Sequence, residues 1–142
     1  MTSGGKKFAL PAFPDDDGAP NLALRAELAS PTKSLIEHLK AARLLVAVVA
    51  VADDIGTGGS DKSSHMAAVS MINAAGQKGL LAFTGIDSLA MWDQSARPVP
   101  VLGTQAAQSA LEDGADALVI DVAGPRRYAV TGRALAELAL FD

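Results

Sequence analysis

The residues best suited to chemistry gather in one glycine-rich segment, DDIGTGGSDKSSHM at residues 53–66, which directly follows the apolar run LLVAVVAVA. From Gly56 the segment differs in one place from the phosphate-binding pattern G-x-x-x-x-G-K-[ST], because Asp61 stands where the second glycine belongs. A phosphate loop needs backbone N–H groups curled around the anion and a helix that follows them. The Asp61 carboxylate would repel the anion, and the residues that follow favour a strand. We therefore expect a connection between two antiparallel strands here, with no nucleotide site.

The same segment offers two other kinds of site. Oxygen and nitrogen ligands for a hard cation are supplied by Asp53, Asp54, Asp61 and His65, but their spacing matches no calcium loop. Ser63 and Ser64 precede His65 directly, and neighbouring residues of a strand point to opposite faces, so they form no nucleophile–base pair. We expect no metal, no cofactor and no catalytic residue. Instead, the glycines of segment 56–64 predict a mobile loop.

Four residues outside this segment could contact a partner. Trp92 is the only tryptophan, and tryptophan and arginine are enriched at binding hot spots. Arg97 lies close by in sequence and could stack on it or bind an anion. Arg126 and Arg127 form a basic pair in a predicted turn. The alternative is that these residues have no binding role. Trp92 would then fill the gap between a helix end and the sheet, and the arginines would be solvated.

Composition limits the classes of protein that fit. The 142 residues suffice for one domain, and 49% are hydrophobic. A net charge of −4 argues against a nucleic-acid binder, and the absence of cysteine excludes disulfides and thiolate metal sites. The longest apolar run, residues 44–52, is far shorter than the roughly 20 residues that cross a bilayer. We expect a cytoplasmic protein that does not bind membranes.

Helices and strands are predicted in the order α-α-β-β-β-α-β-α-β-β-α. The first helix should follow Asn21, and Ser30-Pro31 should end it and start the second. Three antiparallel strands follow, at 44–51, 66–73 and 80–84. A helix comes next, and the proline-containing segment 97–102 should be an edge strand. Thr104 should cap a helix that Gly114 closes, and the last elements are strands 115–122 and 127–131 and a helix from 132.

This order predicts the α+β class: a single two-layer domain in which helices pack on a mostly antiparallel, mixed sheet of five to six strands. Residues 1–19 should form a flexible N-terminal tail, and residues 20–142 the domain. The edge strand and the alanine-rich helix could both support a homodimer.

Several short patterns, in this order and spacing, resemble the SseB family, of the N-terminal-domain type common in actinobacteria. They are the Phe-Thr-x-x-x-x-Leu-x-x-Trp stretch from Phe83 to Trp92, the segment Ala96-Arg97-Pro98-Val99-Pro100, and Gly114-Ala115-Asp116-Ala117. The resemblance covers residues 13–139. It implies a small α+β domain and supplies no catalytic residue.

The sequence therefore favours a non-enzymatic module that binds another protein as an adaptor or regulator. The alternative is a sensor of a small, amino-acid-like metabolite, linked to the serine-sensitivity phenotype from which one branch of the family takes its name. The protein-binding hypothesis places the candidate partner contacts at Trp92, Arg97, Arg126 and Arg127, whereas the sensor would bind its metabolite between the sheet and the helices.

Overall fold

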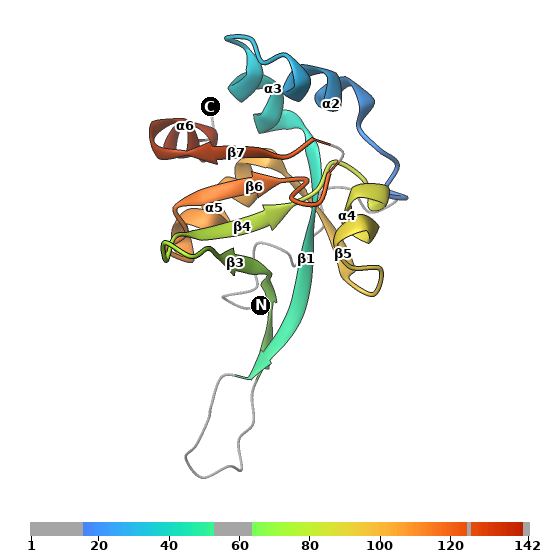
Figure 1. The fold of residues 1–142 in the computed structure, drawn as a ribbon, viewed down its shortest axis with the longest axis vertical. Coiled ribbons are helices and arrows are strands. Elements are labelled where there is room, and N and C mark those ends of the chain that lie inside the picture. The colour runs from blue at the N-terminus through green and yellow to red at the C-terminus, as the bar shows by residue number, and fades with distance from the viewer. Residues whose placement is uncertain (1–15, 53–63, 125, 141–142) are drawn as a thin grey trace.

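The computed structural model describes residues 16–52, 64–124 and 126–140, and Figure 1 draws the remaining residues in grey. The side chains of residues 50–52 and 64–66 also lie outside this description. The ligands considered at Asp53, Asp54 and Asp61 and the mobility expected of segment 56–64 therefore fall outside the described residues. So does most of the predicted tail.

In the part of the chain that the structure describes, seven strands form two sheets. The three-stranded sheet has the order β2-β1-β5 and is antiparallel throughout; its strands are β1 (Arg43–Ala52), β2 (Ser64–Ala68) and β5 (Arg97–Leu102). The four-stranded sheet has the order β3-β4-β6-β7, with β4 parallel to β6 and the outer pairs antiparallel. Its strands are β3 (Ser70–Ile72), β4 (Lys78–Ala82), β6 (Ala117–Ile120) and β7 (Tyr128–Thr131). The predicted α+β class is confirmed, with two sheets in place of one.

The strand predicted at 66–73 is divided at Val69. The Val69 amide donates to Ala47 of β1, and the Val69 carbonyl accepts from Leu81 of β4, so the chain changes partner strand at this residue. The two sheets are also joined directly, because Leu45 and Phe83 exchange both backbone hydrogen bonds at 2.8 Å. This division accounts for the one strand that the predicted element order lacks.

The larger core lies on one face of the sheets, where four helices cover it. These are α2 (Leu22–Ala29), α3 (Leu35–Ala41), α5 (Gly103–Glu112) and α6 (Gly132–Leu138), which supply leucines and alanines to one continuous cluster. Figure 1 shows α5 behind the four-stranded sheet and α2 and α3 above it. In β1, β4 and β6 the even-numbered residues, such as Val46, Leu80 and Leu118, point into this cluster, as the two-residue period of a strand requires.

The opposite face carries a smaller cluster beneath the short helix α4 (Ile86–Trp92). Odd-numbered strand residues, including Leu45, Leu81 and Phe83, contribute to it together with Leu89 of α4. Because α4 is only seven residues long, it covers part of this face. The rest of the four-stranded sheet lies open on that side.

Two predicted helix starts are wrong and two other helix signals are confirmed. Asn21 caps α2 by accepting from the Leu24 amide at 3.1 Å, and Gly114 follows α5 with a φ of +74°, as predicted. However, α3 begins at Leu35 after Ser34, not at Ser30-Pro31, because residues 31–34 form a turn held by Thr32. Similarly, α5 begins at Gly103, before Thr104.

Candidate binding site and a buried polar network

The structure places the four predicted contact residues in two pairs, one at the connection from α4 to β5 and one at the connection from β6 to β7. Trp92 is half-buried at the end of α4, where its ring lies 5.7 Å from that of Phe83 and packs on the smaller cluster. Arg97 is exposed at the start of β5, opposite Val48. Arg126 and Arg127 are exposed between β6 and β7 and make no ion pair or hydrogen bond with any described residue. Of the four, only Arg127 lines the groove that the open sheet face forms.

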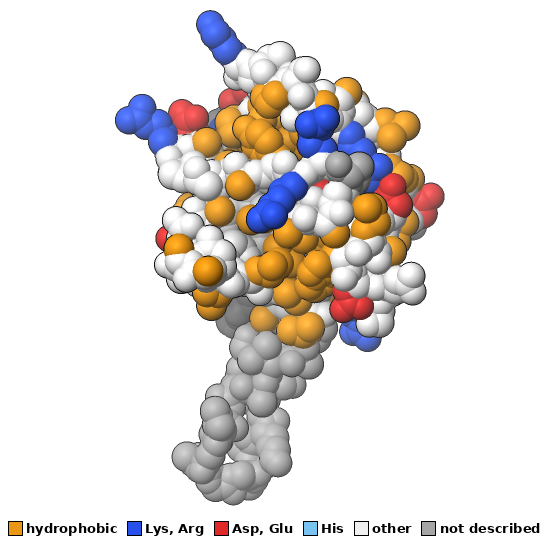
Figure 2. Space-filling model, viewed as in Figure 1, with side chains coloured by type: hydrophobic (Ala, Val, Ile, Leu, Met, Phe, Trp, Pro, Cys, Tyr) orange, Lys and Arg blue, Asp and Glu red, His pale blue; other side chains and the backbone are white. Residues whose placement is uncertain are grey.

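The open face of the four-stranded sheet contains a hollow of about 360 Å³, which we call the sheet groove. Its floor consists of small and apolar residues that alternate along three strands, namely Gly79, Leu81, Ala117, Val119 and Ala129. Gly79 matters to its shape, because a Cβ there would lie only 2.7 Å from Val119 Cγ2. Figure 2, seen from this side, shows apolar side chains gathered over the middle of the molecule. The groove is thus a depression in a sheet that none of the described helices covers.

The two ends of the sheet groove carry opposite charges. At the carboxyl ends of β4 and β6 lies Arg127, directly after Arg126. At the amino ends lie Lys78 and Asp116, and the Lys78 ammonium is bound by Asp113 at 2.9 Å. With one lysine between two carboxylates, this end is acidic. The polarity of the groove therefore runs from basic to acidic over the four-residue length of β6.

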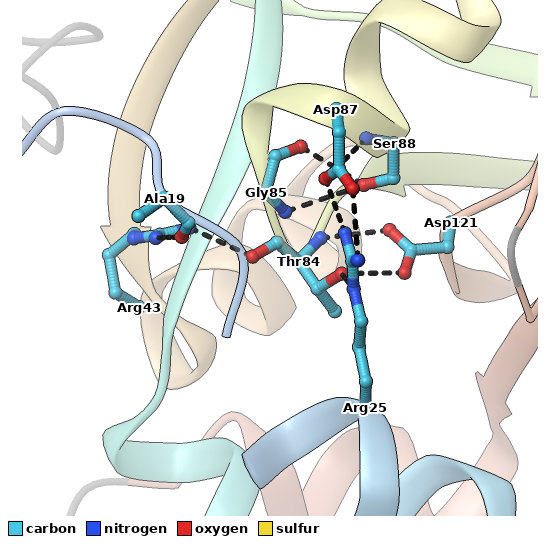
Figure 3. Close-up of polar contacts among 8 residues, drawn as sticks. All are labelled: Ala19, Arg25, Arg43, Thr84, Gly85, Asp87, Ser88 and Asp121. Atoms are coloured by element: carbon cyan, nitrogen blue, oxygen red, sulfur yellow. Dashed lines mark hydrogen bonds and ion pairs between the residues drawn. The ribbon is translucent and has the colours of Figure 1, made fainter. Parts of the chain in front are cut away.

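A buried polar network lies where β4 and β6 end, and Figure 3 shows its members. The Asp121 carboxylate, 1% exposed, accepts the Thr84 amide at 2.8 Å and the Thr84 hydroxyl at 2.7 Å. Arg25 of α2 donates through Nε to the same hydroxyl at 2.7 Å and contacts Asp87 of α4 through both terminal nitrogens. We call these four residues the Asp121 network. It connects two parallel strands to α2 and α4.

A second arginine connects the chain's first described residues to this network. Arg43 of β1 donates to the Thr84 carbonyl at 3.1 Å and to the Ala19 carbonyl, and its Nε lies 3.0 Å from Asp16. The exposed surface of Thr84 is zero. Its hydroxyl is therefore closed to substrates, and the network is positioned to stabilise the fold.

In the Arg25–Asp87 pair, each side chain stabilises the charged form of the other. The hydrogen bond from Arg25 holds the pKa of Asp87 below its usual value, with a further contribution from the Ser88 amide. The same hydrogen bond raises the pKa of Arg25. Both shifts favour the ionised pair.

This pair predicts a specific pH dependence. Because the pKa of Asp87 is lower in the folded than in the unfolded chain, its stabilisation is complete above the unfolded value, near 4, and is lost as pH falls through the folded value. Asp87 is 50% exposed, so solvent screening limits the effect to about 0.5 kcal/mol. Urea unfolding should show Asp87→Asn less stable than the native chain at pH 7 and equal to it near pH 2. In an Arg25→Gln background the pH 7 difference should shrink; an unchanged difference would contradict the pairing.

Sequence reasoning missed the groove floor and most of the Asp121 network. The only available signal for the floor was the presence of small residues, Ala117 and Ala129, in two of the predicted strands. No local signal in the sequence linked Thr84 or Asp87 to Arg25, which lies 59 residues before Thr84. Within the described ranges, no three histidine or acidic side chains lie close enough together to hold a metal ion.

Comparison with known proteins gives one finding on family. The family model described as SseB protein N-terminal domain matches residues 21–137. No curated protein and no solved structure matches the chain. The matched residues include every described helix and strand except the last residue of α6, and so contain both the sheet groove and the Asp121 network.

Proposed function

The chain belongs to the SseB protein N-terminal domain family, and from that premise we propose that it is a non-enzymatic, cytoplasmic protein-binding module of the adaptor or regulatory kind. The sheet groove is its binding surface. The partner contributes a short segment with apolar side chains and an acidic group. No described helix is long and apolar enough to cross a membrane.

One observation carries this proposal: an apolar sheet face that no described helix covers, bordered by arginines that pair with no described residue. Met71 and Val122 extend the apolar lining beyond the floor, and methionine adapts its shape to different partners. Burial of apolar area supplies affinity at about 25 cal/mol per Å², and a guanidinium at the margin selects an acidic group in the partner. Trp92 and Arg97 stay a separate predicted contact, on the α4–β5 side.

A peptide selection tests the proposal. Displayed peptides selected against the full chain should share an apolar core with an acidic flank, and fluorescence polarisation would give their affinity. Ala129→Arg, which places a long cation on the exposed floor, should weaken binding at least tenfold. Ala136→Arg, the same change on the exposed side of α6, is the matched control and should leave binding unchanged. Both positions are exposed, so each variant should keep its stability within about 0.5 kcal/mol.

Two outcomes would contradict the proposal. Equal binding of the selected peptides to the Ala129→Arg and Ala136→Arg variants would place the binding surface elsewhere. A selection that returned no peptide above background would remove the proposal altogether.

A sensor of an amino-acid-like metabolite is the second candidate, and one feature favours it. Arg127 lines the hollow and pairs with no described residue, so its guanidinium could bind the carboxylate of such a metabolite. A volume of about 360 Å³ also falls within the range of small-molecule sites. Thermal unfolding with each of the common amino acids at millimolar concentration separates the two candidates, since a flat response across the panel removes the sensor.

A further inference from the structure

We infer that two copies of the chain associate face to face through the sheet groove, related by a two-fold axis that lies across the strands. Such an axis lies between the two sheets, perpendicular to β4 and β6, and reverses the strand direction of the second copy. Each strand then lies over its own counterpart and antiparallel to it. Two-fold dimers are the commonest assemblies of soluble proteins. The inference does not rest on the proposed function, because a second copy can cover the groove whether or not another protein binds there.

The charges at the two ends of the groove complement themselves when the strands are reversed. Arg127 lies at the carboxyl end of β6 and pairs with no described residue. At the amino end, Asp113 and Asp116 outnumber Lys78, so one negative charge is left uncompensated. A two-fold axis across the strands brings Arg127 of each copy to Asp116 of the other, and the contact occurs twice. An axis along the strands would instead place Arg127 against Arg127.

The sizes of the floor side chains favour the same reversal. On β6, Ala117 lies toward the amino end and the half-buried Val119 toward the carboxyl end. On β7, Thr131 lies beside Ala117, and Ala129 lies beside Val119. With the axis between these two rows, Val119 of each copy lies over Ala117 of the other, and Thr131 lies over Ala129. Facing sheets pack by such interdigitation, whereas an axis along the strands would set Val119 against Val119 and hold the sheets apart.

Exposed apolar surface continues beyond the floor on this side of the molecule. Met71 of β3 lines the groove and is 44% exposed. Met91 of α4 is 57% exposed and lies beside the turn that follows β6, because a Cβ at Gly124 would lie 3.2 Å from its Cε. Figure 2 shows apolar side chains gathered over this face. Contiguous apolar surface of this kind marks an interaction site, and a second copy would remove it from water.

The size of the contact predicts a weak dimer. The floor is about 13 Å along the strands and about 14 Å across four strands spaced about 4.8 Å apart. Stable interfaces usually bury about 1,200–2,000 Å² in total, and a contact of this size lies at or below the lower end of that range. We therefore expect the dimer to form reversibly as concentration rises. It would close the groove in concentrated protein and compete with any partner that binds there.

Charge reversal tests the inference in the full-length chain. Sedimentation equilibrium over micromolar to millimolar concentrations gives the dissociation constant of the dimer. Arg127→Glu should raise this constant at least tenfold, because it sets a carboxylate against Asp116 of the other copy. Arg133→Glu, the same change at an exposed position of α6, is the matched control and should leave the constant unchanged.

Mixing two variants makes the test specific to this geometry. Asp116→Lys alone should also weaken the dimer, because it sets a second cation against Arg127. An equimolar mixture of Arg127→Glu and Asp116→Lys should associate as a heterodimer about as well as the native chain, because both contacts then join opposite charges. Asp116 accepts from the Lys78 amide at 2.9 Å in an exposed position, so circular dichroism should first show that Asp116→Lys is folded.

A measurement on the native chain needs no substitution. As concentration rises, the amide resonances of Val119 and Ala129 should shift along the same curve as the dimer fraction. The amide resonance of Ala136, on the exposed side of α6, should stay in place. This result decides the surface even if Asp116→Lys does not fold.

Each other outcome overturns the inference. A chain that stays monomeric at millimolar concentration has no such dimer, and a dimer that Arg127→Glu leaves intact uses another surface. Folded variants that fail to associate on mixing would exclude the reversed strand direction. If the dimer forms but no peptide is selected, the dimer stands and the proposed protein-binding function fails; selected peptides on a chain that stays monomeric give the reverse.

Discussion

Asp121→Ala should lower the free energy of unfolding by about 3 kcal/mol, because it leaves the Thr84 amide without its acceptor in a site closed to water. The Thr84 hydroxyl loses its acceptor in the same step, and Arg25, which donates to that hydroxyl, loses a nearby negative charge. Each unsatisfied buried polar group costs about 1–3 kcal/mol. Urea unfolding monitored by circular dichroism measures the effect.

Backbone conformation adds to the expected loss and can be measured separately. Asp121 has a φ of +53°, the only positive value among the described non-glycine residues, and aspartate tolerates this region better than alanine does. Asp121→Gly relieves the backbone strain and still removes the carboxylate, so it should stay strongly destabilised. Asp121→Asn keeps an acceptor for the Thr84 amide and the tolerance of positive φ, and should lose only about 1 kcal/mol.

The comparison of these three variants decides whether the network stabilises the fold. If Asp121→Gly were as stable as the native chain, backbone strain would be the whole effect and the hydrogen bonds would contribute nothing. If Asp121→Asn were as damaging as Asp121→Ala, the negative charge itself would be required, through its attraction to Arg25.

Local signals predicted most of the elements correctly. The unbroken apolar run from Leu44 predicted β1, because a strand buried on both faces needs no polar alternation. Pro98 and Pro100 predicted the edge position of β5, since a central strand needs the donors that proline lacks. In both cases the physical cause lies within the segment itself.

Features that depend on distant partners were not predictable in this way. No neighbouring residue in the sequence marks Val69 as the point where the chain changes partner strand. The change follows from the positions of β1 and β4 in the fold. From the sequence, Asp121 is only a polar residue near the end of an apolar strand. Its role as a hydrogen-bond acceptor depends on Thr84, 37 residues away. Thr84 in turn depends on Arg25, a further 59 residues back.

The candidate site likewise contains one feature that is visible locally in the sequence and one that is not. Arg127 could be selected from sequence because an exposed basic pair in a turn is a local feature. The sheet groove could not, because its floor combines residues from three strands and exists only where α4 stops short. A short helix is visible in the sequence, but the area it leaves uncovered depends on the width of the sheet behind it.

Gly103→Ala is expected to destabilise the protein by at least about 3 kcal/mol, the opposite of what its position in a helix suggests. In an ordinary helix, alanine is more favourable than glycine by about 1 kcal/mol. Here a Cβ would lie 1.8 Å from the Leu39 carbonyl oxygen and 2.8 Å from its carbon, where α3 passes the first turn of α5. The Gly103 amide also donates to Ala42 at 2.9 Å, which holds the two backbones together.

No side-chain rotation can relieve this contact, because both atoms of Leu39 belong to the backbone. The helices must therefore separate, which opens the larger core at Leu39 and Ala106, both fully buried. Gly114→Ala is the matched control: its φ of +74° costs about 1 kcal/mol, and no atom lies within 4 Å of the added methyl group. Thermal unfolding of the two variants should rank Gly103→Ala far below Gly114→Ala, and the reverse order would contradict the close approach of α3 and α5.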